Sequence, residues 1–79
     1  MRFVKEIPNT YCKTSLYMFN NKYIIKFEAG LLEQVYKVSE MDVSGDEEVL
    51  AMMTDSFYAK VIQRFKDMAE DFGKLIQEY

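Results

Sequence analysis

The sequence predicts an α+β fold: an antiparallel meander of three to four strands packed on a C-terminal helical segment, a short helix followed by a long one. The hydrophobic pattern has a period of two residues in the front half and changes to about 3.6 after Ser39. A strand-rich half followed by a helical half is typical of a sheet that buries one face against helices.

Length and composition favour one folded domain over residues 1–79. The chain is 49% hydrophobic and 15% aromatic, with three Gly and one Pro, so it does not have the composition of a disordered segment. A domain of this size buries only about 60% of its unfolded surface. We therefore expect no large internal cofactor cavity.

The clearest local feature is a β-hairpin formed by residues 11–19 and 22–29. Asn20-Asn21 separates the two runs, and Asn tolerates the positive φ angles of a two-residue type I′ turn. This turn places Leu16 opposite Ile25 and fixes which side chains share a face. One face is almost entirely apolar and collects Cys12, Thr14, Leu16, Met18, Tyr23, Ile25, Phe27 and Ala29. The other face receives the charges, including a cross-strand ion pair of Lys13 with Glu28.

A third strand over residues 31–38 is predicted to follow a tight turn at 29–30. This turn places Lys26 opposite Glu33, and Gln34 is the polar exception on the apolar face. Residues 3–7 form a plausible first strand that ends before Pro8. The sequence leaves open whether that segment is an edge strand or a loosely held end, and whether it covers the outer sheet face.

Two helix starts are predicted in the back half. Ser44 followed by Glu47 has the form of a capping box, and Thr54 offers a second cap. We expect a short helix to about Met53 and a long helix from about Asp55. The long helix carries a wide apolar stripe consisting of Val61, Phe65, Met68, Phe72, Leu75 and Tyr79, flanked by Ile62, Ala69 and Ile76.

The long helix is expected to project beyond the sheet. About 24 residues in a helix reach about 36 Å, whereas a strand of eight residues spans about 26 Å. The core prediction places Leu16, Ile25 and Phe27 against the helix, and its helix residues are Phe65, Met68 and Phe72.

The chain offers no familiar catalytic or cofactor chemistry. It contains no His, so the Ser-His and Cys-His arrangements are excluded. Its one Cys, Cys12, is on the apolar face of the hairpin and is interpreted as a core residue. The three Gly have no phosphate-loop spacing. We expect no catalytic residues, no cofactor and no enzyme activity.

An acidic segment invites a calcium interpretation that then fails. Asp42, Ser44 and Asp46 match the first alternating ligands of an EF-hand loop. The required Gly is replaced by Glu47, and the bidentate Glu by Met53. Helix capping is the preferred interpretation, and we expect no metal site.

The outer sheet face carries more apolar side chains than a solvated face needs. Tyr17, Ile24 and Val35 are expected to form a row across three strands, rimmed by lysines. Exposed apolar patches of this kind tend to mark interfaces. The candidate interaction surface consists of Tyr17, Phe19, Ile24, Val35, Lys22 and Lys26.

Charge and the N-terminus bear on partners and location. Residues 1–39 hold six basic and three acidic side chains, net +3, and residues 40–79 hold four basic and ten acidic, net −6. The N-terminus does not have the pattern of a signal peptide, and no run approaches the roughly 18 apolar residues of a membrane span. We expect a cytoplasmic protein with no membrane partner.

Three segments, residues 1–8, 20–26 and 30–34, resemble a group of short bacterial proteins of uncharacterised function. The resemblance extends over most of the chain. It implies a bacterial, intracellular, single-domain protein, and it implies no activity and no functional residues.

The leading hypothesis is a small non-enzymatic interaction protein that self-associates, as a homodimer, through its sheet face or its long helix. A foreign protein partner is left open. The alternative is single-stranded nucleic-acid binding on the outer sheet face, with Tyr17 and Phe19 stacking on bases. The acidic back half makes nucleic acid the less favoured partner.

Overall fold

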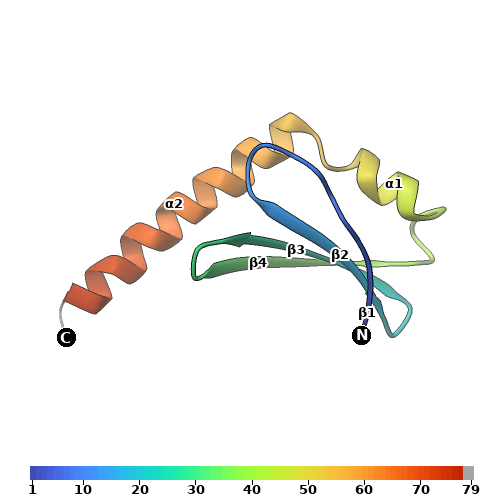
Figure 1. Cartoon of the computed structure of the whole chain (residues 1–79), viewed down its shortest axis with the longest axis horizontal. Helices are drawn as coiled ribbons and strands as arrows, with labels where there is room; N and C mark the ends of the chain where they lie inside the picture. The colour runs from blue at the N-terminus through green and yellow to red at the C-terminus, as the bar shows by residue number, and fades with distance from the viewer. Residues whose placement is uncertain (78–79) are drawn as a thin grey trace.

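The computed structural model describes the backbone of residues 1–77 and the side chains of residues 1–73. The element order is β1 (Arg2–Glu6), β2 (Lys13–Phe19), β3 (Lys22–Ala29), β4 (Leu32–Ser39), α1 (Asp46–Ala51) and α2 (Asp55–Gln77). The strands form one antiparallel sheet in the order β1-β2-β3-β4. Both helices lie on one side of the sheet (Figure 1). This arrangement confirms the predicted α+β fold.

The β2–β3 hairpin has the predicted turn and register. Asn20 and Asn21 have φ angles of 51° and 61°, as a type I′ turn requires. Leu16 pairs with Ile25, and Lys13 lies opposite Glu28. The ion pair nevertheless forms along β3, between Lys26 Nζ and Glu28 Oε1 at 3.8 Å. The prediction that Glu28 pairs with Lys13 across the strands was therefore wrong, because its partner is Lys26.

The register of β4 differs from the prediction by two residues. The turn residues are Gly30 and Leu31, so Lys26 lies opposite Val35, and Glu33 lies opposite Glu28. Gly30 occupies the first central position with φ 62°, which is the glycine position of a type II′ turn. A shift of two residues keeps every side chain on its expected face. The faces were therefore predicted correctly and the neighbours were not.

The first strand is an edge strand paired with β2. A register shift between Phe3 and Lys5 interrupts the ladder, as at a β-bulge. Before the shift, Phe3 lies opposite Tyr17 on the outer face. After it, the Ile7 N–H donates to Thr14 O at 2.8 Å and the Ile7 side chain is buried. The end of the strand is therefore held by the core.

The helix caps follow the chemistry that the sequence indicated, with one correction. Gly45 is the residue at the N-cap of α1, so the predicted capping box at Ser44 and Glu47 was wrong. Instead, Glu48 Oε2 accepts hydrogen bonds from Ser44 N at 2.7 Å and Ser44 Oγ at 2.8 Å. Thr54 caps α2 as predicted, because its Oγ1 accepts from Phe57 N at 3.1 Å.

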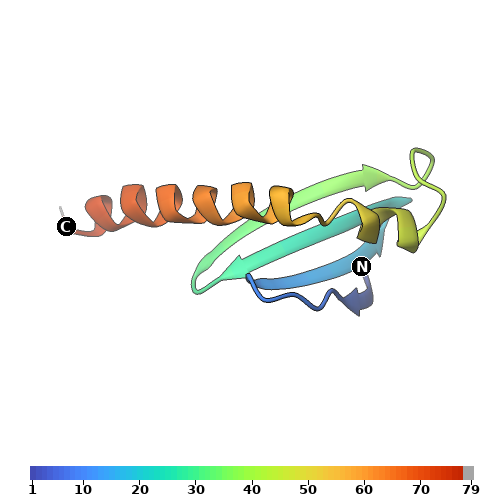
Figure 2. The same ribbon diagram turned by 90° about the horizontal axis from the view of Figure 1, so that it is seen from above.

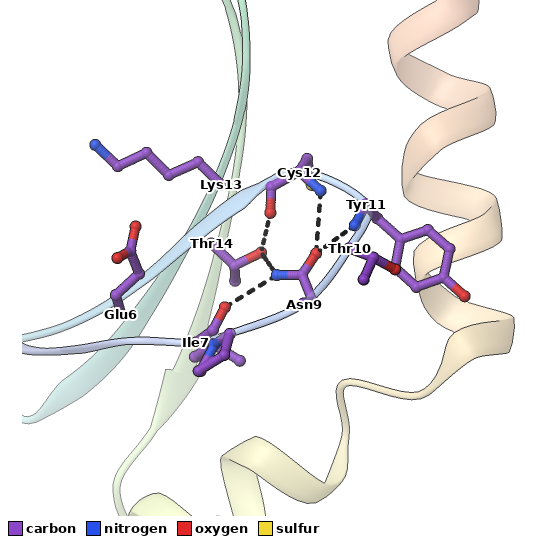
Figure 3. Close-up of a pocket in the computed structure, with 9 residues that line it drawn as sticks. Glu6, Ile7, Asn9, Thr10, Tyr11, Cys12, Lys13 and Thr14 are labelled. Atoms are coloured by element: carbon purple, nitrogen blue, oxygen red, sulfur yellow. Dashed lines mark hydrogen bonds between the residues drawn. The ribbon is translucent and has the colours of Figure 1, made fainter.

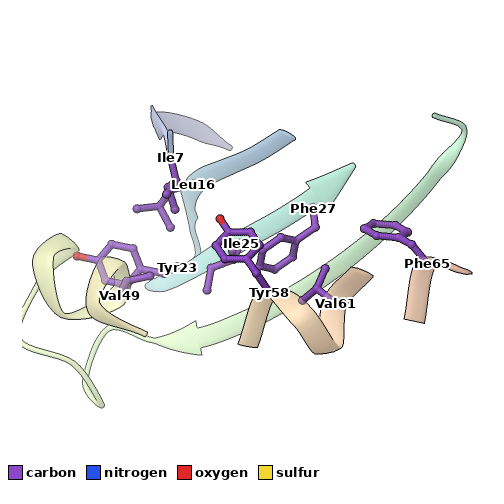
Figure 4. Packing of buried hydrophobic residues seen from close by; sticks show 9 residues of the cluster. All are labelled: Ile7, Leu16, Tyr23, Ile25, Phe27, Val49, Tyr58, Val61 and Phe65. Carbon is purple, nitrogen blue, oxygen red and sulfur yellow. The ribbon is translucent and has the colours of Figure 1, made fainter. Parts of the chain in front are cut away.

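The core lies between the inner sheet face and the two helices (Figure 4). Its buried hydrophobic residues are Ile7, Leu16, Tyr23, Ile25, Phe27, Val49, Tyr58, Val61 and Phe65. Phe27 is at the centre, with its ring 5.8 Å from the ring of Phe57 and 5.6 Å from that of Tyr58. The expectation that Leu16, Ile25, Phe27 and Phe65 are core residues is confirmed.

Two details of the predicted core change. Gln34, the polar exception, is satisfied because its Nε2 donates to Val61 O at 2.9 Å and its Oε1 accepts from Tyr36 Oη at 3.1 Å. Phe72 was expected in the core and is 55% exposed, because α2 has left the sheet at that point. The expected positions at Leu75, Ile76 and Tyr79 lie outside the residues whose side chains are described.

The long helix projects beyond the sheet, as its length predicted. Figures 1 and 2 show α2 passing over β4 and continuing past the β3–β4 turn. The molecule measures 46 × 26 × 19 Å, and its Cα radius of gyration is 14.2 Å, against about 12 Å for a compact domain of this length. The projecting helix accounts for the elongated shape.

Candidate functional site

The outer sheet face is the surface that the sequence singled out, and no helix within residues 1–77 covers it (Figure 1). Tyr17 is half-buried there between two neighbours. Its ring packs edge-to-face with Phe3 at 5.6 Å between centroids, and Lys26 Nζ lies 5.5 Å from the Tyr17 centroid. Phe3 itself is exposed. The first strand therefore covers part of this face with one aromatic side chain and adds that side chain to the surface.

The expected apolar row across three strands does not form. Ile24 lies opposite Lys37 instead of Val35, and it is only 6% exposed. Val35 lies beside Lys26 and is 49% exposed, while Phe19 is 48% exposed. The apolar atoms of this face are thus divided between Phe3 and Phe19 at one edge and Val35 at the other.

The lysines of the outer face are only partly available to an anionic partner. Lys26 is bonded to Glu28 and lies over the Tyr17 ring. Lys22 is exposed at the β2–β3 turn, next to Phe19 in the ladder. The surface therefore offers exposed aromatic rings near a small number of cations.

A second apolar surface lies at the projecting end of α2. Leu31 on the β3–β4 turn is fully exposed and Phe72 is 55% exposed. A pocket between the turn and the helix is lined by Leu31, Leu32, Ala69, Phe72 and Gly73. We call this set the helix-end surface. Phe65 is the last buried residue of α2 among those described, so the helix beyond it has little support from its own sheet.

The loop before β2 encloses a polar pocket lined by residues 6–14 (Figure 3). Asn9 organises this loop. Its Oδ1 accepts from Tyr11 N at 2.8 Å and Cys12 N at 3.0 Å, and its Nδ2 donates to Ile7 O at 2.9 Å and Thr14 Oγ1 at 3.1 Å. Asn9 therefore holds the loop through bonds within the loop itself.

Cys12 does not have the environment of a reactive thiol. Its side chain is partly buried, and desolvation by burial raises the pKa of the thiol. A nucleophilic cysteine needs a lowered pKa from nearby positive charge. This supports the interpretation of Cys12 as a packing residue.

Two stacked tyrosines connect the loop to the start of α2. The Tyr11 and Tyr58 rings lie 5.0 Å apart with an interplanar angle of 13°. The charge of Asp55 raises the pKa of Tyr11, and burial raises the pKa of Tyr58. Both phenols therefore stay protonated at neutral pH. Tyr58 Oη lies 2.8 Å from Thr14 Oγ1, which joins α2 to β2 inside the core.

The acidic segment does not gather into a metal site. Within the described part of the chain, no group of three or more acidic or Cys side chains is placed to hold a metal ion. Glu48 is bonded to Ser44, and these hydrogen bonds lower its pKa. These bonds hold Ser44 to the first turn of α1, but they do not form the predicted capping box, because the N-cap residue is Gly45.

Sequence reasoning missed two contributors to these surfaces and one residue of the core. Phe3 and Leu31 were not in the candidate set, although each is an apolar residue at an edge or turn. Tyr58 was not in the apolar stripe, yet it lies three residues before Val61, which is the helical spacing.

No protein-family model, curated protein or solved structure matches the chain. None of the helices in residues 1–77 combines the length and the apolar character needed to span a bilayer.

Proposed function

We propose that this chain is a small, non-enzymatic interaction protein that self-associates as a homodimer through the helix-end surface. The observation that carries the proposal is the end of α2, where the apolar stripe of the sequence continues beyond Phe65, the last buried residue of the helix among those described. Leu31 and Phe72 are exposed there on either side of an apolar pocket. A domain of this size gains stability by burying such surface against a copy of itself.

The size of the surface sets the expected strength. The helix-end surface consists of five residues, against about 20–30 residues on each side of a standard interface. We therefore expect a reversible dimer that forms at tens of micromolar, roughly −6 kcal/mol.

The test is the mass in solution, by light scattering or sedimentation. At about 1 mM the parent should have close to twice the chain mass of 9.4 kDa, and on dilution to about 20 μM its mean mass should fall toward that of the monomer. Leu31→Ser and Phe72→Ser should return the monomer mass while keeping the far-UV circular dichroism of the parent.

Phe19→Ser is the matched control, because Phe19 has a similar exposure on the outer face. It should leave the dimer intact. A monomer at about 1 mM would contradict self-association, and a dimer lost only in Phe19→Ser would move the interface to the outer face.

The second candidate function is single-stranded nucleic-acid binding on the outer sheet face. The observation in its favour is the exposure of Phe3, and of Phe19 beside Lys22, because bases stack on aromatic rings near cations. The lysine bonded to Glu28 and the net charge of −3 weigh against it.

Anisotropy of a labelled oligonucleotide of about 20 nucleotides at about 0.1 M salt tests this candidate. We expect no binding below about 10 μM. Submicromolar binding that weakens with salt, and that disappears in Tyr17→Ala/Phe19→Ala, would replace the self-association proposal.

A further inference from the structure

The outer edge of β4 presents backbone groups with which no other strand in the described part of the chain pairs. β4 is the last strand of the sheet among residues 1–77. Glu40 N donates to Asn21 O at 3.0 Å just beyond the end of β4. Since bonding alternates along an antiparallel strand, the even-numbered residues of β4 bond to β3. The N–H and C=O groups of Glu33, Val35 and Lys37 therefore point away from the sheet.

The two edges of the sheet differ in their capacity to take another strand. β1 has five residues, and a register shift interrupts it; short, bulged edges are poor templates for pairing. β4 has eight residues, an unbroken register with β3 and no Pro. Within the described residues, Figure 2 shows no other strand beside its outer edge. Of the two edges, β4 is the one suited to strand addition.

An apolar pocket lies on the inner side of the same edge. It is lined by Ile25, Tyr36, Val38, Met52, Met53 and Phe57. Tyr36 and Val38 come from β4 itself, so this pocket adjoins the strand where an added strand would lie. On the outer side, Glu33 and Lys37 are exposed on either side of Val35. The edge thus combines backbone donors and acceptors, an apolar pocket and two opposite charges.

A second copy of β4 does not suit this edge. α2 packs on β4, with Gln34 Nε2 bonded to Val61 O and Arg64 Nη1 donating to Tyr36 Oη at 3.1 Å. Two β4 strands paired about a two-fold axis would bring both α2 helices over the same strands. A single extended segment carries no helix and avoids this conflict.

We propose that the outer edge of β4 binds an extended segment of another protein as a fifth, antiparallel strand. Main-chain hydrogen bonds to Glu33, Val35 and Lys37 supply affinity in this mode of recognition, and alternate side chains supply specificity. The segment places apolar side chains toward the pocket at Val38. On the opposite face it places an acidic residue beside Lys37 and a basic residue beside Glu33. This inference does not depend on self-association, which uses the end of α2.

The probe is a fluorescent synthetic peptide, Leu-Glu-Val-Thr-Val-Lys-Leu, whose charges match β4 in antiparallel register. Its anisotropy is followed as protein is added to about 1 mM, with Phe72→Ser titrated beside the parent because that variant is expected to stay monomeric. We expect a dissociation constant of about 100 μM. A peptide with Pro in place of the central Thr should bind at least about tenfold more weakly, because it lacks an N–H at the centre of the ladder.

Two protein variants separate backbone pairing from side-chain contact. Val35→Pro removes the outward N–H, and Pro is tolerated on an edge strand at such a position. Val35→Thr is the matched control, because it replaces one methyl group with a hydroxyl and keeps the backbone N–H of residue 35. We expect Val35→Thr to bind within about twofold of the parent and Val35→Pro to lose at least about tenfold.

If Val35→Pro does not fold, the binding site is located instead from the amide chemical shifts of the parent protein as peptide is added. Peptide addition should shift the amides of Glu33, Val35 and Lys37 most strongly. Absence of binding at about 1 mM peptide, equal binding by the two variants, or shifts confined to other surfaces would overturn the proposal. None of these outcomes would alter the mass of the dimer, so the two proposals fail separately.

Discussion

The buried hydrogen bond between Thr14 and Tyr58 gives a stability prediction that the structure defines closely. Tyr58→Phe removes one hydroxyl from a pair that lies 2.8 Å apart inside the core. The Thr14 hydroxyl keeps two contacts, with Asn9 Nδ2 at 3.1 Å and Cys12 O at 3.3 Å. Because no buried group is left unpaired, the free energy of unfolding should fall by only about 1 kcal/mol.

Removing the other hydroxyl of this pair, that of Thr14, should lower the free energy of unfolding by more. Thr14→Val leaves the Tyr58 hydroxyl, on a side chain that is 2% exposed, without its hydrogen-bond partner in the core. Desolvating an unpaired polar group costs about 1–3 kcal/mol. The double variant removes both hydroxyls, so its cost should fall short of the sum of the single costs by about 1 kcal/mol.

Urea unfolding followed by circular dichroism measures all four proteins. With an m-value near 1 kcal/mol/M for a small domain, Tyr58→Phe should lower the midpoint by about 1 M and Thr14→Val by about 2 M. Additive costs, or single variants within about 0.3 kcal/mol of the parent, would refute the account of this contact.

Three further predictions concern the core, a helix start and a turn. Phe65→Ala should destabilise by about 3–5 kcal/mol, and a melting temperature within a degree or two of the parent's would contradict its place in the core. Glu48→Gln should weaken the bonds from Ser44, because a neutral amide oxygen accepts less strongly than a carboxylate. Because hydrogen bonding lowers the pKa of Glu48, the difference from the parent should be full above pH of about 4.3 and shrink as the pH falls further, as a series of urea curves would show. Gly30→Ala should cost about 1–2 kcal/mol by the same assay, because Ala does not favour a φ of 62°.

The fold was predictable because its signals are local. The Asn20-Asn21 turn and the alternation on either side of it determine the central hairpin. The register of β4 was not predictable, because a turn at residues 29–30 and a turn at residues 30–31 put the same side chains on each face of the sheet. The backbone conformation of Gly30 decides between them. The predicted capping box of α1 was wrong for a similar reason. Glu47 and Glu48 both follow Ser44 at a spacing that allows a hydrogen bond, and the spacing alone does not decide which of them forms it.

The candidate surfaces were predictable in part. Alternation placed Tyr17, Phe19 and Val35 on the outer face, and length arithmetic predicted that α2 would project. The burial of Ile24 was not predictable, because it depends on how neighbouring side chains pack over it. Nor did the pattern indicate that Leu31 would sit fully exposed on a turn, since that follows from the register of β4.

Self-association through the end of α2 is the central claim, and amide chemical shifts on dilution test it most directly. Spectra of the labelled protein are compared between about 1 mM and about 20 μM. We predict that the shifts that change lie in residues 30–32 and 66–77, and that Phe72→Ser abolishes the change. Spectra that do not change with concentration, or changes centred on Phe19 and the outer sheet face, would contradict the claim.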